Sequence, residues 1–165
     1  MTTATDDLVR AAAAHEAAFT GPEAQIPARA VAIVTCMDAR VDPARIFGLE
    51  PGQAHVVRNG GGLVTDDVLR SLVLSQRVLH TREVVLVHHT RCGLHGGDEQ
   101  QLRAAIASET GEEPPYAFGM FTDLDAAVRD AIRRVREHPF LPHRDTVRGF
   151  VYDVETGGVR EVTPR

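Results

Sequence analysis

Two apolar runs, in which polar residues do not alternate with apolar ones, constrain the fold of this chain most strongly. Residues 29–36 read RAVAIVTC and residues 82–89 read REVVLVHH, and both are rich in β-branched side chains. Such runs are typical of strands that are covered on both faces in a parallel sheet. The first run ends at Cys36, and the second ends at His89 with Cys92 three residues later. We therefore expect side chains suited to chemistry at the ends of two buried strands.

Helical segments lie between the apolar runs, and this alternation predicts an α/β fold. The segment 42–48 starts with Asp42 and Pro43 and ends at Gly48, which are preferred residues at helix starts and ends. Alternating strands and helices predict a mostly parallel central sheet flanked by helices, with a C-terminal hairpin at its edge. The expected helices are 6–19, 42–48, 65–80, 98–108 and 122–137, and the expected strands are 29–36, 54–59, 82–89 and two within 146–162.

The 165 residues suit one domain preceded by a short N-terminal extension. Residues 1–28 comprise an alanine-rich helix and a loop marked by Gly21, Pro22 and Pro27. A face of small residues buries little against its own core but permits close packing, so we expect this helix to pack on a partner subunit. Residues 29–165 are expected to form a single α/β domain that carries the site.

Charge, hydropathy and cysteine content argue against several classes of protein. The formal net charge of -5 argues against broad nucleic-acid binding, which needs a basic surface. No run of 17 apolar residues occurs, so no membrane span is expected, and the acidic N-terminus lacks the basic start of a secretory signal. Two cysteines are too few for a disulfide scaffold, which favours a cytoplasmic location.

The three residues Cys36, His89 and Cys92 form a candidate metal site. Binding sites in open α/β sheets lie beyond the carboxyl ends of the strands, where these residues are expected. Two thiolates and one imidazole suit Zn²⁺, and three protein ligands with an open fourth position are typical of catalytic zinc. Two other interpretations remain at this point: the cysteines are small buried hydrophobic residues, or they form a redox pair.

Asp38 and Arg40 follow Cys36 on the loop after the first strand. Beside a metal, such a carboxylate can exchange between two partners, the metal and the guanidinium. The alternative is an exposed ion pair, which contributes little to stability. The pair therefore favours a working metal site without establishing it.

The segments CMDAR (36–40) and HTRCG (89–93) together resemble the β-class carbonic anhydrase pattern C-x-D-x-R followed by H-x-x-C. The segment RNGGG at 58–62, the helix from Thr65 and the C-terminal RGFVYDVETGGVREV are also similar to that family. The resemblance covers about residues 29–162, and the short chain is similar to compact bacterial members.

The resemblance implies reversible hydration of carbon dioxide to bicarbonate and a proton by zinc-bound hydroxide. It implies one Zn²⁺ per chain on Cys36, His89 and Cys92. Asp38 is expected to accept a hydrogen bond from the hydroxide, or to occupy the fourth zinc position in a closed state, and Arg40 to orient Asp38. The family further implies a homodimer or a dimer of dimers.

Other positions are expected to shape the pocket or support it. We expect the Gly93 backbone N–H to help position the substrate, and Arg58 and Asn59 to brace the loop. Some residues depart from commoner members of the family without changing the ligands: His88 and Leu94 stand where glycine is frequent, and Gly60 and Gly61 replace bulkier residues. His88 is expected to project to the opposite side of its strand from His89.

Two other functions fit the same residues. One is hydrolysis of a sulfur analogue such as carbonyl sulfide on the same scaffold, because only the pocket shape would differ. The other is a non-catalytic zinc-binding or thiol-sensing module, which would need neither Asp38 nor Arg40.

Overall fold

Five strands form one sheet in the order β2-β1-β3-β4-β5, in a computed structural model that describes residues 2–21 and 24–164. β1 pairs in parallel with β2 and β3, and β3 pairs in parallel with β4, whereas β5 runs antiparallel to β4 at the edge. The mostly parallel sheet with a C-terminal edge hairpin is thus confirmed. Pro22 of the predicted loop lies outside the described residues. The strands are Val31–Cys36 (β1), Ala54–Asn59 (β2), Glu83–His89 (β3), Val147–Tyr152 (β4) and Val159–Val162 (β5).

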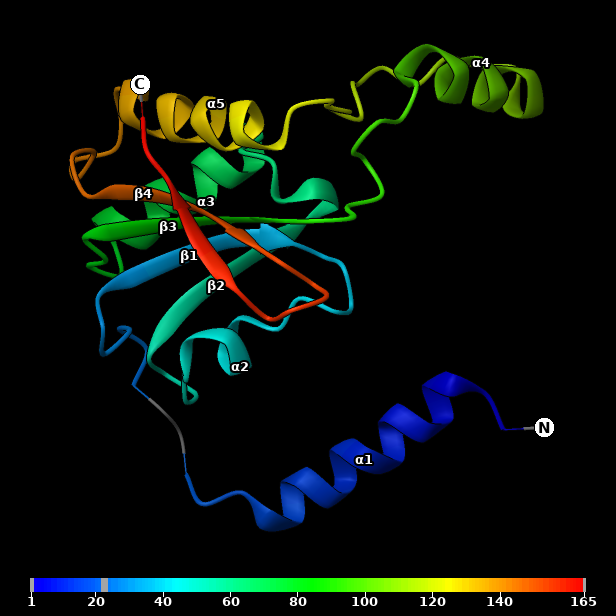
Figure 1. Ribbon diagram of the computed structural model, residues 1–165. Coiled ribbons are helices and arrows are strands. Elements are labelled where there is room, and N and C mark those ends of the chain that lie inside the picture. The colour runs from blue at the N-terminus through cyan, green and yellow to red at the C-terminus, as the bar shows by residue number, and fades with distance from the viewer. Residues whose placement is uncertain (1, 22–23, 165) are drawn as a thin grey trace.

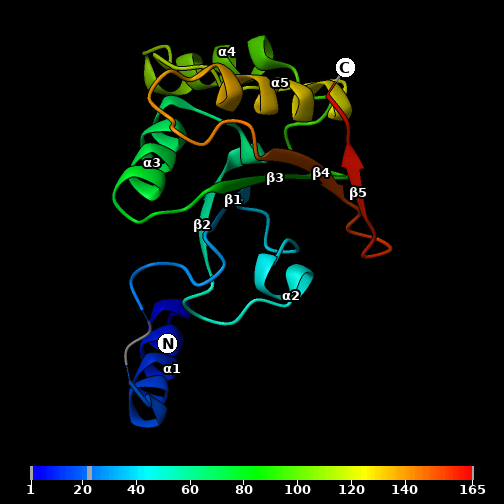
Figure 2. The same ribbon diagram turned by 90° about the vertical axis from the view of Figure 1, so that its left-hand side faces the viewer.

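Helices cover both faces of the sheet (Figure 2). α3 (Asp66–Arg77) and α5 (Leu124–Glu137) lie on one face, and the short α2 (Pro43–Phe47) lies on the other. The main core lies between the sheet and the helices α3 and α5. It is built from alternate strand residues and from one apolar stripe of each helix. Fully buried members of this core are Val34, Leu86, Leu72, Val128 and Ile132.

Local sequence signals set the element boundaries. The Asp42 carboxylate accepts hydrogen bonds from the N–H groups of Ala44 and Arg45, and Gly48 ends α2 in the left-handed conformation, as predicted. β1 starts at Val31 rather than at 29, because Ala30 has a φ of 50° that breaks the extended chain. α3 stops at Arg77, before His80 turns the chain with a φ of 60°.

Two helices project away from the sheet (Figure 1). α1 (Ala4–Ala18) and α4 (Glu99–Thr110) contain no buried residue among those described. α1 begins with a capping box between Thr3 and Asp6, so its start is defined locally. In the described part of the chain, no helix has the length and apolar character needed to cross a membrane.

Candidate metal centre

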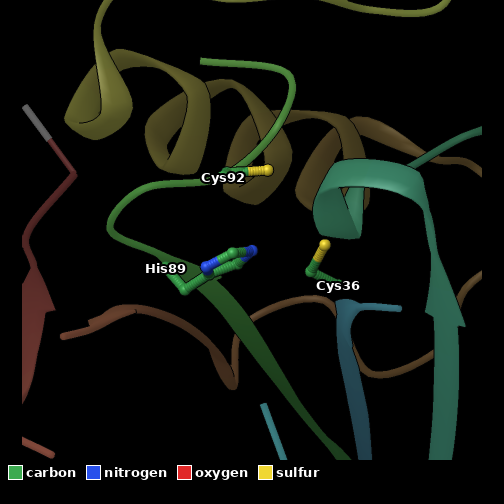
Figure 3. Close-up of side chains that lie close together, drawn as sticks. All are labelled: Cys36, His89 and Cys92. Atoms are coloured by element: carbon green, nitrogen blue, oxygen red, sulfur yellow. The ribbon is translucent and has the colours of Figure 1, made fainter. Parts of the chain in front are cut away.

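Three metal-binding side chains from separate parts of the sequence meet beyond the carboxyl ends of β1 and β3. One ligand atom each of Cys36, His89 and Cys92 lies within 4.8 Å of the others, and all three residues are buried. Figure 3 shows the two sulfur atoms and the imidazole pointing toward one another. Parallel pairing of β1 with β3 brings Cys36 and His89 together, and the turn after β3 returns Cys92 to them. The juxtaposition therefore follows from the order of the strands.

The His89 imidazole has one nitrogen committed to the protein and one left for a ligand. Its Nδ1 lies 2.9 Å from the carbonyl oxygen of Thr90, which makes Nδ1 the protonated nitrogen. Its Nε2 is buried, and no residue of the described chain forms a hydrogen bond with it. An unpaired buried acceptor is costly. Two cysteine sulfurs and this nitrogen are a donor set that fits Zn²⁺, with the backbone carbonyl fixing the tautomer.

Electrostatics in the site favour a bound cation. Burial raises the pKa of Cys92, and the neighbouring Cys36 raises it further, so the Cys92 thiol resists ionisation without a positive charge. Burial also lowers the pKa of His89, which keeps its imidazole neutral and able to act as a ligand. The backbone nitrogen of Asp38 lies 3.5 Å from the Cys36 sulfur and donates a hydrogen bond to it. A divalent cation would compensate for both thiolates.

Asp38 lies beside the ligands, turned toward Arg40. Arg40 donates from Nε to Oδ1 at 2.9 Å and from Nη2 to Oδ2 at 2.7 Å, and its backbone N–H also donates to Oδ1 at 2.9 Å. These hydrogen bonds hold the pKa of Asp38 well below its usual range. Asp38 Oδ2 is 3.9 Å from His89 Nε2, so the carboxylate borders the ligand atoms. The side chain of Asp38 is 19% exposed, which separates this pair from an ordinary surface ion pair.

The loop that carries Asp38 is braced by the end of β2. Arg58 donates from Nε to the carbonyl oxygen of Cys36 at 3.0 Å and from Nη2 to that of Asp38 at 2.8 Å. Asn59 exchanges two hydrogen bonds with the backbone of Leu63, at 2.8 and 2.9 Å, and closes the glycine turn over residues 60–62. Both residues therefore occupy supporting positions rather than reacting ones.

The glycine turn lies directly against the backbone of the first ligand. Gly62 has a φ of +68°, and a Cβ on it would lie 2.9 Å from the Cys36 nitrogen. Only glycine combines this conformation with so close an approach. Gly93, the proposed substrate-positioning residue, follows Cys92 and is exposed.

His88 is separate from the ligand cluster. It is 1% exposed and lines a cavity of about 560 Å³ beneath α5, with its ring 6.0 Å from that of Phe121. Burial lowers the pKa of His88 to about 4, so it is neutral at physiological pH.

Sequence reasoning missed part of the support around the site. The carbonyl oxygen of Arg91 accepts a hydrogen bond from Arg40 Nη2 at 3.0 Å, and Arg91 has a φ of 54°. A contact made by a backbone carbonyl cannot be predicted from the pattern of side chains in the sequence.

Comparison with known proteins places this geometry in one family. The family model described as carbonic anhydrase matches residues 31–159. "Beta-carbonic anhydrase 1" of Mycobacterium tuberculosis is 44% identical over 162 residues, which cover 98% of this chain and 99% of that protein. The crystal structure of a carbonic anhydrase from Streptococcus mutans has a TM-score of 0.91 and 38% identity, and the match covers 99% of each chain. A carbon disulfide hydrolase of Saccharolobus solfataricus is 33% identical over 153 residues, covering 78% of this chain and 75% of that protein.

Proposed function

Because the chain belongs to the β-class carbonic anhydrase family, we propose that it catalyses the reversible hydration of carbon dioxide to bicarbonate and a proton, with one Zn²⁺ per chain. The observation that carries the proposal is the Asp38 carboxylate, which Arg40 orients beside two thiols and an imidazole. The sequence identity with the mycobacterial enzyme over almost the whole of both chains supports the same substrate. A cytoplasmic location is also proposed, from the cysteine content alone.

In this proposal Cys36, His89 and Cys92 hold the metal. When bound, Zn²⁺ would lower the pKa of a coordinated water and so supply a nucleophile near neutral pH. The Thr90 carbonyl keeps the proton of His89 on Nδ1 and leaves Nε2 to bind. The backbone N–H of Asp38 donates a hydrogen bond to the Cys36 sulfur.

Asp38 and Arg40 are proposed to orient the reacting water. Asp38 Oδ2 is placed to accept a hydrogen bond from a water beside His89 Nε2, which fixes the direction of the lone pair that attacks carbon dioxide. Arg40 holds Asp38 away from the ligand atoms through two parallel hydrogen bonds. Gly93 is exposed, and its backbone N–H is proposed to donate a hydrogen bond to a substrate oxygen.

A second candidate is hydrolysis of a sulfur analogue such as carbonyl sulfide or carbon disulfide. The relative from Saccharolobus solfataricus favours it, because a carbon disulfide hydrolase shares the family with 33% identity. The higher identity and coverage of the mycobacterial relative favour carbon dioxide. A non-catalytic zinc or thiol sensor is the weakest candidate, since it has no use for the oriented Asp38.

A substrate comparison tests the proposal. The zinc-loaded protein is mixed in a stopped-flow instrument with carbon dioxide, carbonyl sulfide or carbon disulfide under the same conditions. We expect kcat/KM for carbon dioxide to exceed the other two values. A larger kcat/KM for either sulfur compound would assign the chain to the second candidate. If no substrate were turned over, the non-catalytic sensor would be the remaining candidate.

We further propose that the working unit is a homodimer or a dimer of dimers. α1 has no buried residue among those described, and its apolar side chains are no exception: Leu8 is 71% exposed and Val9 is 63% exposed. An isolated helix of 15 residues is marginally stable in water. A second copy of the chain would cover the apolar residues of α1, and the projecting α4 offers a second contact.

A further inference from the structure

We propose that Glu99 is a positioning residue that fixes the Cys92 loop and thereby slows the loss of the metal. Glu99 is the first residue of α4, and its side chain bonds to residues 118–120 rather than to a ligand. The inference rests on the proposed zinc site but concerns a part of the chain outside it.

Glu99 binds three consecutive backbone N–H groups of the segment that returns from α4. Its Oε1 accepts from Phe118 at 2.7 Å, and its Oε2 accepts from Gly119 at 3.0 Å and from Met120 at 3.2 Å. A carboxylate that accepts several N–H groups forms strong, charge-assisted hydrogen bonds. The same bonds, that of Phe118 first, lower the pKa of Glu99, so it stays charged at neutral pH. Glu99 therefore fixes residues 118–120, which lie in no helix or strand.

The next residue, Phe121, connects this fixed segment to the loop after β3 that carries Cys92, called here the metal loop. Its N–H donates to the carbonyl of Leu94 at 3.2 Å, and its carbonyl accepts from the N–H of Gly96 at 2.8 Å. The two segments thus form a short parallel bridge at His95. The rings of His95 and Phe121 also stack, with centroids 5.5 Å apart. Residues 94–96 are therefore held to residue 121 by both backbone and side-chain contacts.

The bridged residues directly follow the third ligand. His95 N–H donates to the carbonyl of Cys92 at 3.0 Å and closes the turn that presents the sulfur. Leu94 packs against the glycine turn, because a Cβ on Gly61 would lie 2.7 Å from its Cδ1. Loosening residues 118–120 would free residues 94–96 and, with them, Cys92.

A second residue of α4 provides a matched control, which tests whether any loosening of this region speeds the loss of the metal. Arg103, one turn after Glu99, donates to the carbonyl oxygens of Tyr116 at 2.6 Å and Pro114 at 2.8 Å. It holds the same helix to the same returning segment, but at residues that are not bridged to the metal loop. Glu109 is exposed on the same helix and serves as the control for lost charge.

The experiment measures the rate at which the zinc-loaded protein releases its metal to an excess of a chromogenic chelator. Glu99→Gln keeps the size of the side chain but places an amide NH₂ against at least one N–H donor. We expect this variant, and Glu99→Ala, to release zinc about tenfold faster, which is on the order of the smallest loss of metal affinity that follows when a residue orienting a ligand is replaced. Arg103→Ala and Glu109→Gln are expected to release it at the wild-type rate.

Circular dichroism, light scattering and thermal unfolding in EDTA would establish that the variants fold and associate alike. Release from Glu99→Gln within a factor of two of the wild-type rate would overturn the proposal. So would equally fast release from Arg103→Ala, because any loosening of the α4 region would then suffice. Absence of zinc from the wild-type protein would contradict the proposed function itself, a distinguishable result.

Discussion

The guanidinium of Arg40 binds both carboxylate oxygens of Asp38 and, through the same Nη2, the carbonyl oxygen of Arg91. Arg91 immediately precedes the ligand Cys92, so Arg40 joins the loop after β1 to the loop after β3. Arg40 therefore orients Asp38 and also contacts the loop that carries the third ligand.

Replacing Arg40 should separate metal binding from catalysis. In Arg40→Gln, Asp38 loses the two hydrogen bonds that the guanidinium donates to its carboxylate. The carboxylate is then expected to turn to the metal and occupy its fourth coordination position. Misplacement of a catalytic group can reduce rates roughly 100-fold, and we expect a loss of this order in carbon dioxide hydration. Zinc content, measured by elemental analysis, should stay at the wild-type level, because no ligand is removed. A wild-type hydration rate for Arg40→Gln would show that the pair does not control the site.

The pH dependence of activity should come from the metal centre rather than from Asp38 or Arg40. The Arg40 hydrogen bonds lower the pKa of Asp38, and the same pair raises the pKa of Arg40. Asp38 thus contributes stability above the usual carboxylate pKa of about 4, and this contribution is lost as the pH falls through its lowered pKa.

Neither group titrates near neutral pH, whereas water on Zn²⁺ has a pKa near 7. Hydration activity is therefore expected to rise between about pH 7 and 8.5. Initial rates in stopped-flow assays would check this, and equal rates at both ends of that range would be inconsistent with it.

Substitution of Gly62 should reduce stability, while the same change at Gly60 should be nearly neutral. Alanine at residue 62 must adopt a φ of +68° and approach the Cys36 backbone, whereas a Cβ on Gly60 meets no atom within 4 Å. The left-handed conformation alone costs roughly 1 to 3 kcal/mol for a residue other than glycine. Urea unfolding of both variants in EDTA would measure the difference without a contribution from metal. Equal stabilities of the two variants would show that the close approach of residue 62 to the Cys36 backbone does not require glycine.

Association should depend on α1. Light scattering of the wild-type protein at micromolar concentration is expected to give about twice the chain mass of 17.9 kDa, or a multiple of that value. Leu8→Glu places a charge on an exposed apolar position of α1 and should shift the mass toward the monomer. Glu16→Gln on the same helix should leave the mass unchanged. A wild-type mass near 17.9 kDa would argue against the dimer.

Much of the fold could be predicted from sequence because its determinants are local. The apolar residues of β1 and β3 predicted a buried parallel sheet, and Asp42, Pro43 and Gly48 marked both ends of α2. The two halves of the metal site could be found because each contains side chains with specific chemistry next to a strand end. Their convergence then followed from the pairing of β1 with β3.

The parts that could not be predicted depend on contacts between distant backbone groups. Glu99 looks like an ordinary first-turn acid, and nothing in residues 118–120 marks their N–H groups as its partners. Likewise, the bridge between His95 and Phe121 joins two segments without strand-like sequences. The projection of α4 away from the sheet has no sequence signal, because its composition is that of any exposed helix.

The most direct test of the account is zinc content together with carbon dioxide hydration, measured on the same preparations of the wild-type chain and Cys92→Ser. The account predicts one zinc per wild-type chain and hydration in proportion to zinc content. It predicts that Cys92→Ser lacks both, because a serine hydroxyl does not ionise to replace the thiolate. Full zinc content and wild-type hydration in Cys92→Ser would contradict the assignment of the metal centre.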